Sequence, residues 1–393
     1  MKIKVLFMII NMNVGGTEKA LLNMISIMPR QEFEITIFML EKSGGFLNYI
    51  PDWVHVKSFN DYHEIKSVIN EPPLKVIKTL LKKANVFEAV LLFLIHVYSA
   101  LTKERSLLYK YLLHKYPNEG EYDIAVAYAG PMDFISFFIA NKVIAKKKIQ
   151  WIHFDITKIG FNNKFSFKIF RRFDKIFVVS DEGKAKLINK LPSLNEKIET
   201  FKNIVSNVNI QGLANQGEGF KDNFNGIRIL TVGRLSAEKG QDLIIPVLAK
   251  LKGEGFNIRW YCIGEGAARE EYENLIIRYG VEEDFILLGS NPNPYPFIKQ
   301  CDIYVQPSRH EGYCITLTEA KYFNKPIVST NFTGANEQLN QNETGMIVEV
   351  NSKDIYLAVK KLLTDKSLQI KFTKNLENES DSRTNNHFKI VDL

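Results

Sequence analysis

The sequence is poor in cysteine and lacks a long apolar run, and each shortage excludes a class of protein. Only three of its 393 residues are cysteines, Cys262, Cys301 and Cys314, which are far apart and show no CxxC spacing. Neither a disulfide framework nor a zinc site is expected, and a reducing cytoplasm suits the chain.

No stretch is apolar enough over a sufficient length to be expected to span a membrane. The N-terminal run is short and is followed by Asn11 and Asn13, so it is expected to be a first strand rather than a signal peptide. The most apolar stretch, from Val86 to Ala100, is shorter than the roughly 20 residues of a spanning helix and contains Glu88 and His96. We expect a buried helix or one that dips into a membrane.

The composition is that of a globular protein with two domains. Hydrophobic residues make up 45% and charged residues 24% of the chain, which excludes a disordered or fibrous protein. Single hydrophobic cores stop growing at about 250 to 300 residues, so a chain of this length divides in two. The net charge of +7 permits nucleic acid, anionic lipid or phosphate-bearing partners.

Basic residues alternate with phenylalanines between Phe161 and Lys175. This alternation favours an anionic membrane surface over a nucleic-acid duplex. We therefore expect peripheral association with the inner face of the cell membrane and no nucleic acid partner. The alternative interpretation is a solvated helix face above ordinary core aromatics. The residues concerned are Phe161, Lys164, Phe165, Phe167, Lys168, Phe170, Arg171, Arg172, Phe173 and Lys175.

Short runs rich in Val, Ile and Phe alternate with helical patterns, which is typical of parallel sheets. The fold class predicted is α/β, with two doubly wound Rossmann-like domains facing a cleft. The first domain is expected over residues 1–205, with a helical insertion at about 60–120, and the second over 206–374. Residues 206–225 are expected to be a connector, and the tail 375–393 could return to the first domain. Strands are expected at 4–10, 34–40, 54–58, 123–128, 148–153, 175–180, 227–232, 258–263, 285–288, 303–306, 326–330 and 346–350.

Ligands of open parallel sheets bind beyond the carboxyl ends of the strands, so functional residues are expected in the loops that follow strands. After the first strand, Gly15 and Gly16 precede a helix that includes Lys19. Two glycines let the backbone approach a ligand closely, and the amides of a helix N-terminus favour an anion. The alternative is an ordinary tight turn. The pattern is not GxGxxG, so no nicotinamide cofactor is implied.

The first loop of the second domain carries two cations between glycines. Arg234 and Lys239 lie in a turn bounded by Gly233 and Gly240. Both side chains can converge on a diphosphate, arginine through its fork and lysine as a point charge. The alternative is a pair of solvated surface cations.

Two carboxylates flank the start of a helix after the strand at 303–306. Glu311, followed by Gly312, belongs to the loop and can accept hydrogen bonds from hydroxyl groups. Glu319 lies about two turns along the helix and can reach a ribose. The alternative is that both are surface charges.

His153 ends a strand of the first domain. An isolated histidine is more often structural than functional, but a position at a strand end facing the cleft would let it donate to a transferred sugar.

The chain resembles glycosyltransferase family 4, whose fold is called GT-B. The resemblance covers the whole chain, with a poor match over 60–120. It rests on TVGRLSAEKG from Thr231, the CIGEG turn that includes Gly264, FILLGS from Phe285, and the E-x7-E pattern of Glu311 and Glu319. The string GGTEKALLN from Gly15 matches the glycine loop of the family's first domain.

The resemblance implies a role for each matching residue. Arg234 and Lys239 would bind the donor diphosphate and stabilise the leaving group. Glu311 would hold hydroxyls of the transferred sugar and Glu319 the nucleotide ribose, while His153 stands where the family often has a histidine that contacts the sugar. Backbone and framing positions of the donor site would be Gly15, Gly16, Gly233, Gly264, Gly312, Tyr313, Cys314 and Ile315.

The implied function is that of a retaining glycosyltransferase. It would move a sugar from a nucleotide diphosphate donor, a UDP-sugar by family frequency, to a cell-surface glycan such as a capsule or exopolysaccharide, or to a lipid-linked acceptor. No Asp-x-Asp occurs, so no metal or other cofactor is expected. The alternatives are a nucleotide-sugar epimerase of the same fold and a non-catalytic partner subunit. Tyr313-Cys314 departs from the Phe-Gly that is common in the family.

Overall fold

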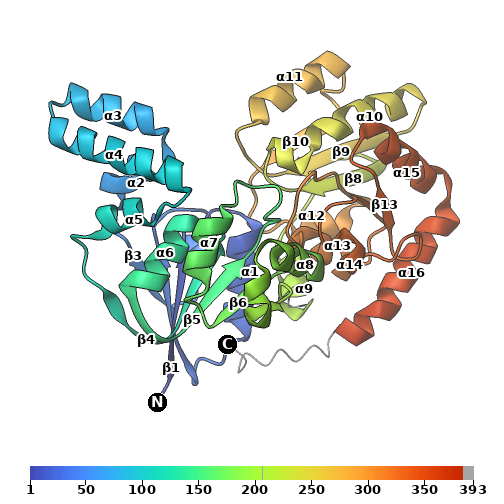
Figure 1. Ribbon diagram of the computed structural model, residues 1–393. Helices are drawn as coiled ribbons and strands as arrows, with labels where there is room; N and C mark the ends of the chain where they lie inside the picture. Colours follow the sequence, from blue (N-terminus) through green and yellow to red (C-terminus); the bar gives the residue numbers. More distant parts are fainter. Residues whose placement is uncertain (206, 384–393) are drawn as a thin grey trace.

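The computed structural model describes residues 1–205 and 207–383. Within them the strands form two separate sheets, each parallel throughout (Figure 1). We call the parts built on these sheets the N-terminal domain and the C-terminal domain. The α/β fold class and the Rossmann-like architecture are confirmed.

The N-terminal sheet has seven strands in the order β3-β2-β1-β4-β5-β6-β7. Most of its strands are buried on both faces, which is why they appear in the sequence as continuous apolar runs. The strands are β1 (Ile3–Ile9), β2 (Phe33–Met39), β3 (His55–Ser58), β4 (Glu119–Gly130), β5 (Val143–Ile152), β6 (Lys175–Val178) and β7 (Ile198–Thr200).

Helices cover both faces of this sheet, as in other doubly wound folds. Between β3 and β4 lie four helices, α2 to α5, within the insertion expected at about 60–120. The helices of this domain are α1 (Gly16–Ile27), α2 (Tyr62–Asn70), α3 (Pro73–Lys82), α4 (Val86–Thr102), α5 (Ser106–Leu113), α6 (Asp133–Lys142), α7 (Asn163–Phe170) and α8 (Asp181–Lys190), with 3-10 turns η1 (Leu47–Tyr49) and η2 (Pro192–Lys197).

The C-terminal sheet has six strands in the order β10-β9-β8-β11-β12-β13, which repeats the strand order of the dinucleotide-binding fold. Its strands are β8 (Ile227–Val232), β9 (Ile258–Ile263), β10 (Phe285–Gly289), β11 (Ile303–Gln306), β12 (Ile327–Thr330) and β13 (Met346–Val348). Its helices are α9 (Asn207–Gln216), α10 (Gln241–Gly253), α11 (Arg269–Tyr279), α12 (Tyr295–Gln300), α13 (Ile315–Tyr322), α14 (Ala335–Gln338), α15 (Ser352–Thr364) and α16 (Lys366–Arg383), with the 3-10 turn η3 (Ala237–Lys239).

The expected connector, residues 206–225, contains a helix. Ten of its residues form α9. Ile210 and Ala214, one turn apart, are buried in the core of the C-terminal domain, and Asn293 donates to the carbonyl of Leu213. The predicted boundary at residue 205 falls between β7 and β8.

The end of the described chain lies on the C-terminal domain. Residues 375–383 continue α16, where Leu376 is buried and the Asn375 side chain donates to the carbonyl of Glu343. The remainder of the tail that was predicted to cross to the first domain, 384–393, lies outside the described residues.

The segment from Phe161 to Lys175 is a core element, so the interpretation of its aromatics as membrane-facing is wrong. Phe165, Phe170 and Phe173 are fully buried under the N-terminal sheet, and only Phe167 is exposed. Its cations have structural partners as well: Lys168 pairs with the buried Glu104 at 2.9 Å. The alternative interpretation, core aromatics beneath a polar face, is the correct one.

Candidate active site

The loops that carry the predicted donor residues meet because of strand order. β8 and β11 are hydrogen-bonded neighbours although 70 residues lie between them in the sequence, and the strand order reverses at this pair, which is where doubly wound sheets bind ligands. The turn after β9 packs against the loop after β8. A Cβ at Gly264, where φ is +152°, would lie 2.0 Å from the carbonyl oxygen of Gly233, so only glycine fits there.

Lys239 and Glu311 form an ion pair across these two loops. Lys239 Nζ lies 2.6 Å from Glu311 Oε1, and Ser308 Oγ donates to the same oxygen over 2.8 Å. The two side chains are 22% and 9% exposed. Burial lowers the pKa of Lys239, but attraction to Glu311 outweighs it and the net pKa is raised. Lys239 is therefore a permanent cation.

Arg234 reaches from the same loop toward the N-terminal domain. Its side chain is 59% exposed and has a weak contact of 4.0 Å with Glu238. A Cβ on Gly15 would come within 3.9 Å of its guanidinium. Beside it, burial raises the pKa of Glu18, opposed by a hydrogen bond to the Glu18 backbone and by the charge of Arg234. The exposed guanidinium is thus available to a ligand at the domain junction.

Glu319 lies on helix α13 and is buried. It is 2% exposed and accepts a hydrogen bond from Tyr295 Oη over 2.8 Å. Lys19 of α1 lies with its Nζ 4.9 Å from the Tyr295 ring centre. Burial raises the pKa of Glu319 to about 7, against the attraction of Lys19 and the Tyr295 hydrogen bond. Its carboxyl group therefore changes charge near neutral pH.

His153 follows β5 and lies under the loop of Glu311. It is 6% exposed, with its ring 4.5 Å from that of Tyr128. Burial lowers its pKa to about 3, opposed by a hydrogen bond to the Tyr128 backbone. Its Nε2 is buried and has no hydrogen-bond partner among the described residues. A Cβ on Gly312 would lie 2.0 Å from the His153 carbonyl oxygen, so glycine alone permits this contact between the domains.

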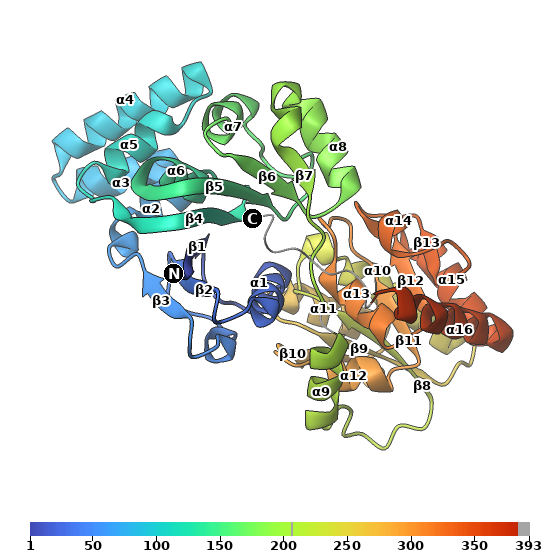
Figure 2. The same ribbon diagram turned by 90° about the horizontal axis from the view of Figure 1, so that it is seen from below.

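The glycine turn of the N-terminal domain faces the start of α13. A Cβ on Gly16, the first residue of α1, would lie 3.6 Å from the Ile315 side chain. Cys314 caps α13 in the left-handed conformation with φ +58°, a region that disfavours residues other than glycine. Burial raises the pKa of its thiol. Tyr313 packs partly against the core of the N-terminal domain, so this loop touches both domains; Figure 2 shows α1 between them.

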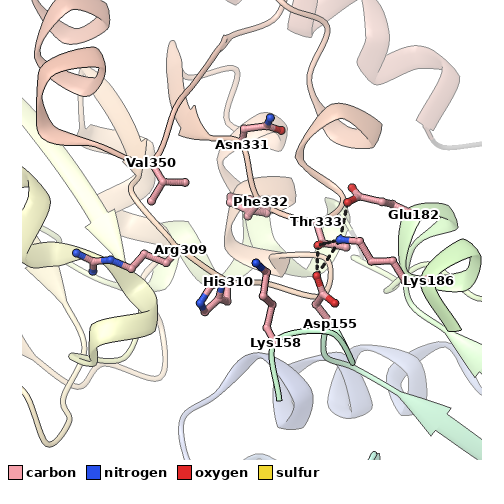
Figure 3. Close-up of a pocket in the computed structure, with 10 residues that line it drawn as sticks. All are labelled: Asp155, Lys158, Glu182, Lys186, Arg309, His310, Asn331, Phe332, Thr333 and Val350. Carbon is pink, nitrogen blue, oxygen red and sulfur yellow. Dashed lines mark hydrogen bonds and ion pairs between the residues drawn. The ribbon is translucent and has the colours of Figure 1, made fainter. Parts of the chain in front are cut away.

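A cavity of about 410 Å³ lies next to these residues in the cleft, and the sequence did not reveal it (Figure 3). None of the predicted site residues lines it, although Arg309 and His310 directly precede Glu311. Both domains contribute to its wall: Asp155, Lys158, Glu182 and Lys186 from one, and Arg309, His310, Asn331, Phe332, Thr333 and Val350 from the other.

Polar contacts join the two domains along this cavity. Asp155 accepts from Thr333 over 2.6 Å and from Lys186 over 2.8 Å, and Lys186 also donates to Thr333. Burial raises the pKa of Asp155, but these hydrogen bonds hold it well below its usual range. The Gly334 amide donates to Glu182 over 3.0 Å. Hydrogen bonds at Thr333 and Gly334 thus hold the two domains together next to the site.

The part of the chain that the structure describes shows neither a metal-binding cluster nor a membrane-spanning helix. No cluster of three or more His, Cys, Asp or Glu side chains with metal-binding geometry occurs in it, and metal independence stays a prediction. No helix within residues 1–205 and 207–383 combines the length and the apolar character needed to cross a membrane.

Solved structures with this architecture are GT-B glycosyltransferases. HepE of Anabaena, in a complex with UDP-glucose, superposes with a TM-score of 0.68 at 17% identity and covers 97% of this chain and 95% of its own. TarM of S. aureus, in a complex that includes UDP, gives 0.67 at 15% identity over 96% of each chain. At such identities the likeness establishes the fold: the chain has the GT-B fold.

Residues 219–379 match the family model "Glycosyl transferases group 1". A Campylobacter jejuni N-acetylgalactosaminyltransferase acting on an undecaprenol-linked acceptor is 30% identical over 53% of this chain and 56% of its own length. The capsular polysaccharide glycosyltransferase CapM of Staphylococcus aureus is 32% identical over 35% of this chain and 37% of its own. The chain thus spans about half the length of the first of these relatives.

Proposed function

We propose that the chain is a retaining glycosyltransferase. It transfers a sugar from a nucleotide diphosphate donor, a UDP-sugar, to a growing cell-surface glycan or a lipid-linked acceptor. The match of residues 219–379 to the glycosyl transferases of group 1 supports the reaction class. The UDP present in the complexes of HepE and TarM supports the choice of nucleotide.

One observation carries the proposal. Two cations and a carboxylate from two different loops of the C-terminal domain converge at the strand-order reversal, against the glycine turn of the other domain. Lys239 and Glu311 are in direct contact, and Arg234 reaches Gly15. Such a site offers positive charge to a diphosphate and a hydrogen-bond acceptor to a sugar.

The charge that develops on the departing nucleotide diphosphate is the main electrostatic demand of the reaction. Arg234 and Lys239 stabilise it, and fixed cations do so without reorganising in the transition state. The first turn of α13, at Ile315, presents backbone amides that have no partner within the helix and suit a phosphate oxygen. We propose that these groups act without a divalent metal.

The remaining residues hold the sugar and the nucleoside. Glu311 accepts hydrogen bonds from sugar hydroxyls, and Glu319 from the ribose. Gly16 lets the α1 backbone approach the sugar closely. His153, neutral because of its low pKa, uses its unpartnered Nε2 for a hydrogen bond to the sugar and does not act as a proton donor of the imidazolium type.

The acceptor enters from the cleft. The cavity of about 410 Å³ lies between the domains beside His310, the residue before Glu311, so a hydroxyl group bound in it is next to the donor sugar. A lipid-linked or polysaccharide acceptor agrees with what the names of the Campylobacter and Staphylococcus relatives state for those proteins.

A panel of UDP- and GDP-sugars tests the proposal. The purified protein is expected to release UDP or GDP from one donor, and faster when a glycan acceptor is present. The double variant Lys239→Met with Glu311→Gln, which removes both charges of the pair, is the control and should release none. NMR of the product should show that the anomeric configuration of the donor is kept. Release of nucleotide from no donor by a folded protein, conversion of one nucleotide sugar into its epimer, or an inverted product would contradict the proposal.

A further inference from the structure

Helix α4 presents a broad apolar face to solvent. Its 17 residues include one charged residue, Glu88. Ala89, Leu92 and Ile95 are buried against the N-terminal domain, yet the opposite side is apolar too. Exposed fractions there run from 39% to 81%, and two leucines of the neighbouring α3 extend the face. These residues, which we call the α3–α4 face, are Leu74, Leu81, Val86, Phe87, Val90, Phe93, Leu94, Val97, Tyr98 and Leu101.

The α3–α4 face holds many exposed hydrophobic side chains close together, whereas elsewhere on the surface they are scattered. Ten of the 25 large hydrophobic side chains that are exposed on the described structure fall within the 28 residues from Leu74 to Leu101. Single exposed hydrophobics are normal on a protein surface, but a contiguous group marks an interaction site. The contacts of α4 with its own domain use Leu92 and Ile95, and the described residues leave the outer face open to solvent.

The charge around the α3–α4 face identifies the partner. Between Pro72 and Asn118 there are eight Lys or Arg and two Glu, and three of these cations, Lys75, Arg105 and Lys115, pair with acidic side chains outside the segment. Lys78 and Lys82 are exposed on α3, one turn apart, and Lys103 is exposed at the end of α4. Two copies of such a surface would repel each other, whereas an anionic one attracts it.

We propose that the α3–α4 face docks on an anionic lipid bilayer. Helix α4, about 25 Å long at 1.5 Å per residue, lies in the plane of the headgroups with Phe87, Phe93 and Leu94 among the acyl chains. Lys78 and Lys82 contact lipid phosphates. The helix does not cross the bilayer, because it is too short and carries Glu88 and His96.

The position of the face suits a role in the proposed function. In Figure 1, α3 and α4 stand out from the upper end of the N-terminal domain, the end at which β1 and its neighbours finish. The loops after β1 and β5 carry Gly15 and His153 of the candidate site. A lipid-linked acceptor held in the bilayer would then be near the cleft. This role rests on the proposed glycosyl transfer, but the docking does not, since vesicle binding and nucleotide release are measured separately.

Co-sedimentation with vesicles tests the docking. The wild type should bind phosphatidylcholine vesicles that contain phosphatidylglycerol, bind pure phosphatidylcholine at least tenfold more weakly, and dissociate as salt is raised. The variant Phe87→Ser/Phe93→Ser/Leu94→Ser and the variant Lys78→Glu/Lys82→Glu should each bind at least tenfold more weakly. The control Ile277→Ser/Leu357→Ser removes residues of the C-terminal domain that are similarly exposed, at 63% and 52%, and should bind like the wild type.

A fluorescence measurement keeps the proposal falsifiable if a variant misfolds. The cysteines Cys262, Cys301 and Cys314 are buried, so a cysteine placed at Leu94 can be labelled with an environment-sensitive fluorophore. Its emission should shift to the blue on addition of phosphatidylglycerol vesicles, and that of a label at Ile277 should not. Unchanged emission at Leu94, wild-type vesicle binding by the triple serine variant, or a wild-type dimer that this variant converts to a monomer would overturn the proposal.

Discussion

Lys239 Nζ lies 2.6 Å from Glu311 Oε1, which joins two loops whose residues are 72 positions apart in the sequence. The cation proposed to neutralise the leaving diphosphate is thus held by the carboxylate proposed to bind the sugar. The charge of Glu311 raises the pKa of the largely buried Lys239 and so keeps Lys239 in its charged form. A bound donor must share this pair or separate it.

Removing one member of this pair should damage both activity and stability. Lys239→Met and Glu311→Gln are each expected to slow donor turnover by about 10²- to 10³-fold, the usual effect of losing one group that stabilises charge in the transition state. Each should also lower the free energy of unfolding by about 1 to 3 kcal/mol, because a buried charge loses its partner. Urea denaturation and nucleotide release measure the two effects. The double variant should regain stability but no activity; single variants with wild-type turnover would disprove the assignment.

The carboxyl group of Glu319 should make stability depend on pH. Its pKa is about 7 in the folded chain and 4.5 as a free group, so folding favours the protonated form. The stabilisation is complete below pH 4.5 and is lost as the pH rises to about 7. Relative to Glu319→Gln, which does not titrate, the wild type should lose up to about 3 kcal/mol across this window. Denaturation of both proteins across the pH range measures it, and parallel stability curves would contradict the expectation.

His153 should contribute a hydrogen bond without titrating. With a pKa near 3 it stays neutral throughout the working range of pH. Replacing it with glutamine should slow transfer by about five- to tenfold, the cost of one neutral hydrogen bond of about 1 to 1.5 kcal/mol. The pH dependence of the rate should keep its shape in His153→Gln. An inflection between pH 6 and 7 that disappears in the variant would show that the histidine titrates in the working enzyme.

The polar contacts between the domains should control how far the cleft opens. Asp155→Asn weakens the charge-assisted contacts of Asp155 to Lys186 and Thr333. X-ray scattering should then give a larger radius of gyration, and amide exchange should become faster at residues 331–337. Glu218→Gln, which breaks an exposed pair with Lys221, is the matched control and should change neither. An unchanged radius in Asp155→Asn would show that other contacts hold the domains.

Transfer should not require a divalent metal. Because Arg234 and Lys239 supply the positive charge in the proposed mechanism, activity should survive an excess of chelator. Nucleotide release measured with and without added magnesium or manganese checks this. A strict requirement for either metal would disprove this part of the proposal.

The bounds of the apolar strands could be predicted closely from the sequence. The polar residues that extend some of these strands could not. β8, β9 and β11 have the bounds expected from their apolar runs. β5 begins at Val143, five residues before its expected start, because the residues that follow the buried Val143 are exposed or half-buried and include Lys146 and Lys147. β7, an edge strand of three residues, is too short to give a pattern.

The sequence could not predict which distant residues of the site contact one another. The loops of Arg234 and Glu311 stood out because glycines and strand ends frame them. By contrast, Thr333 lies 178 residues from Asp155, and neither stands in a recognisable motif. The phenylalanines near Phe165 gave an ambiguous signal, since the same alternation with cations fits a core helix and a membrane surface.

The contact of Lys19 with Tyr295 and Glu319 has a thermodynamic consequence. Lys19 belongs to the N-terminal domain and Glu319 to the C-terminal domain, and their attraction strengthens when the carboxyl group is ionised. If the ribose donates hydrogen bonds to the ionised Glu319, as proposed, nucleotide binding favours the arrangement in which the domains touch. Linkage is reciprocal, so domain contact must raise nucleotide affinity by the same factor. The affinity for a nucleotide that touches only the C-terminal domain would therefore still depend on contact with the N-terminal domain.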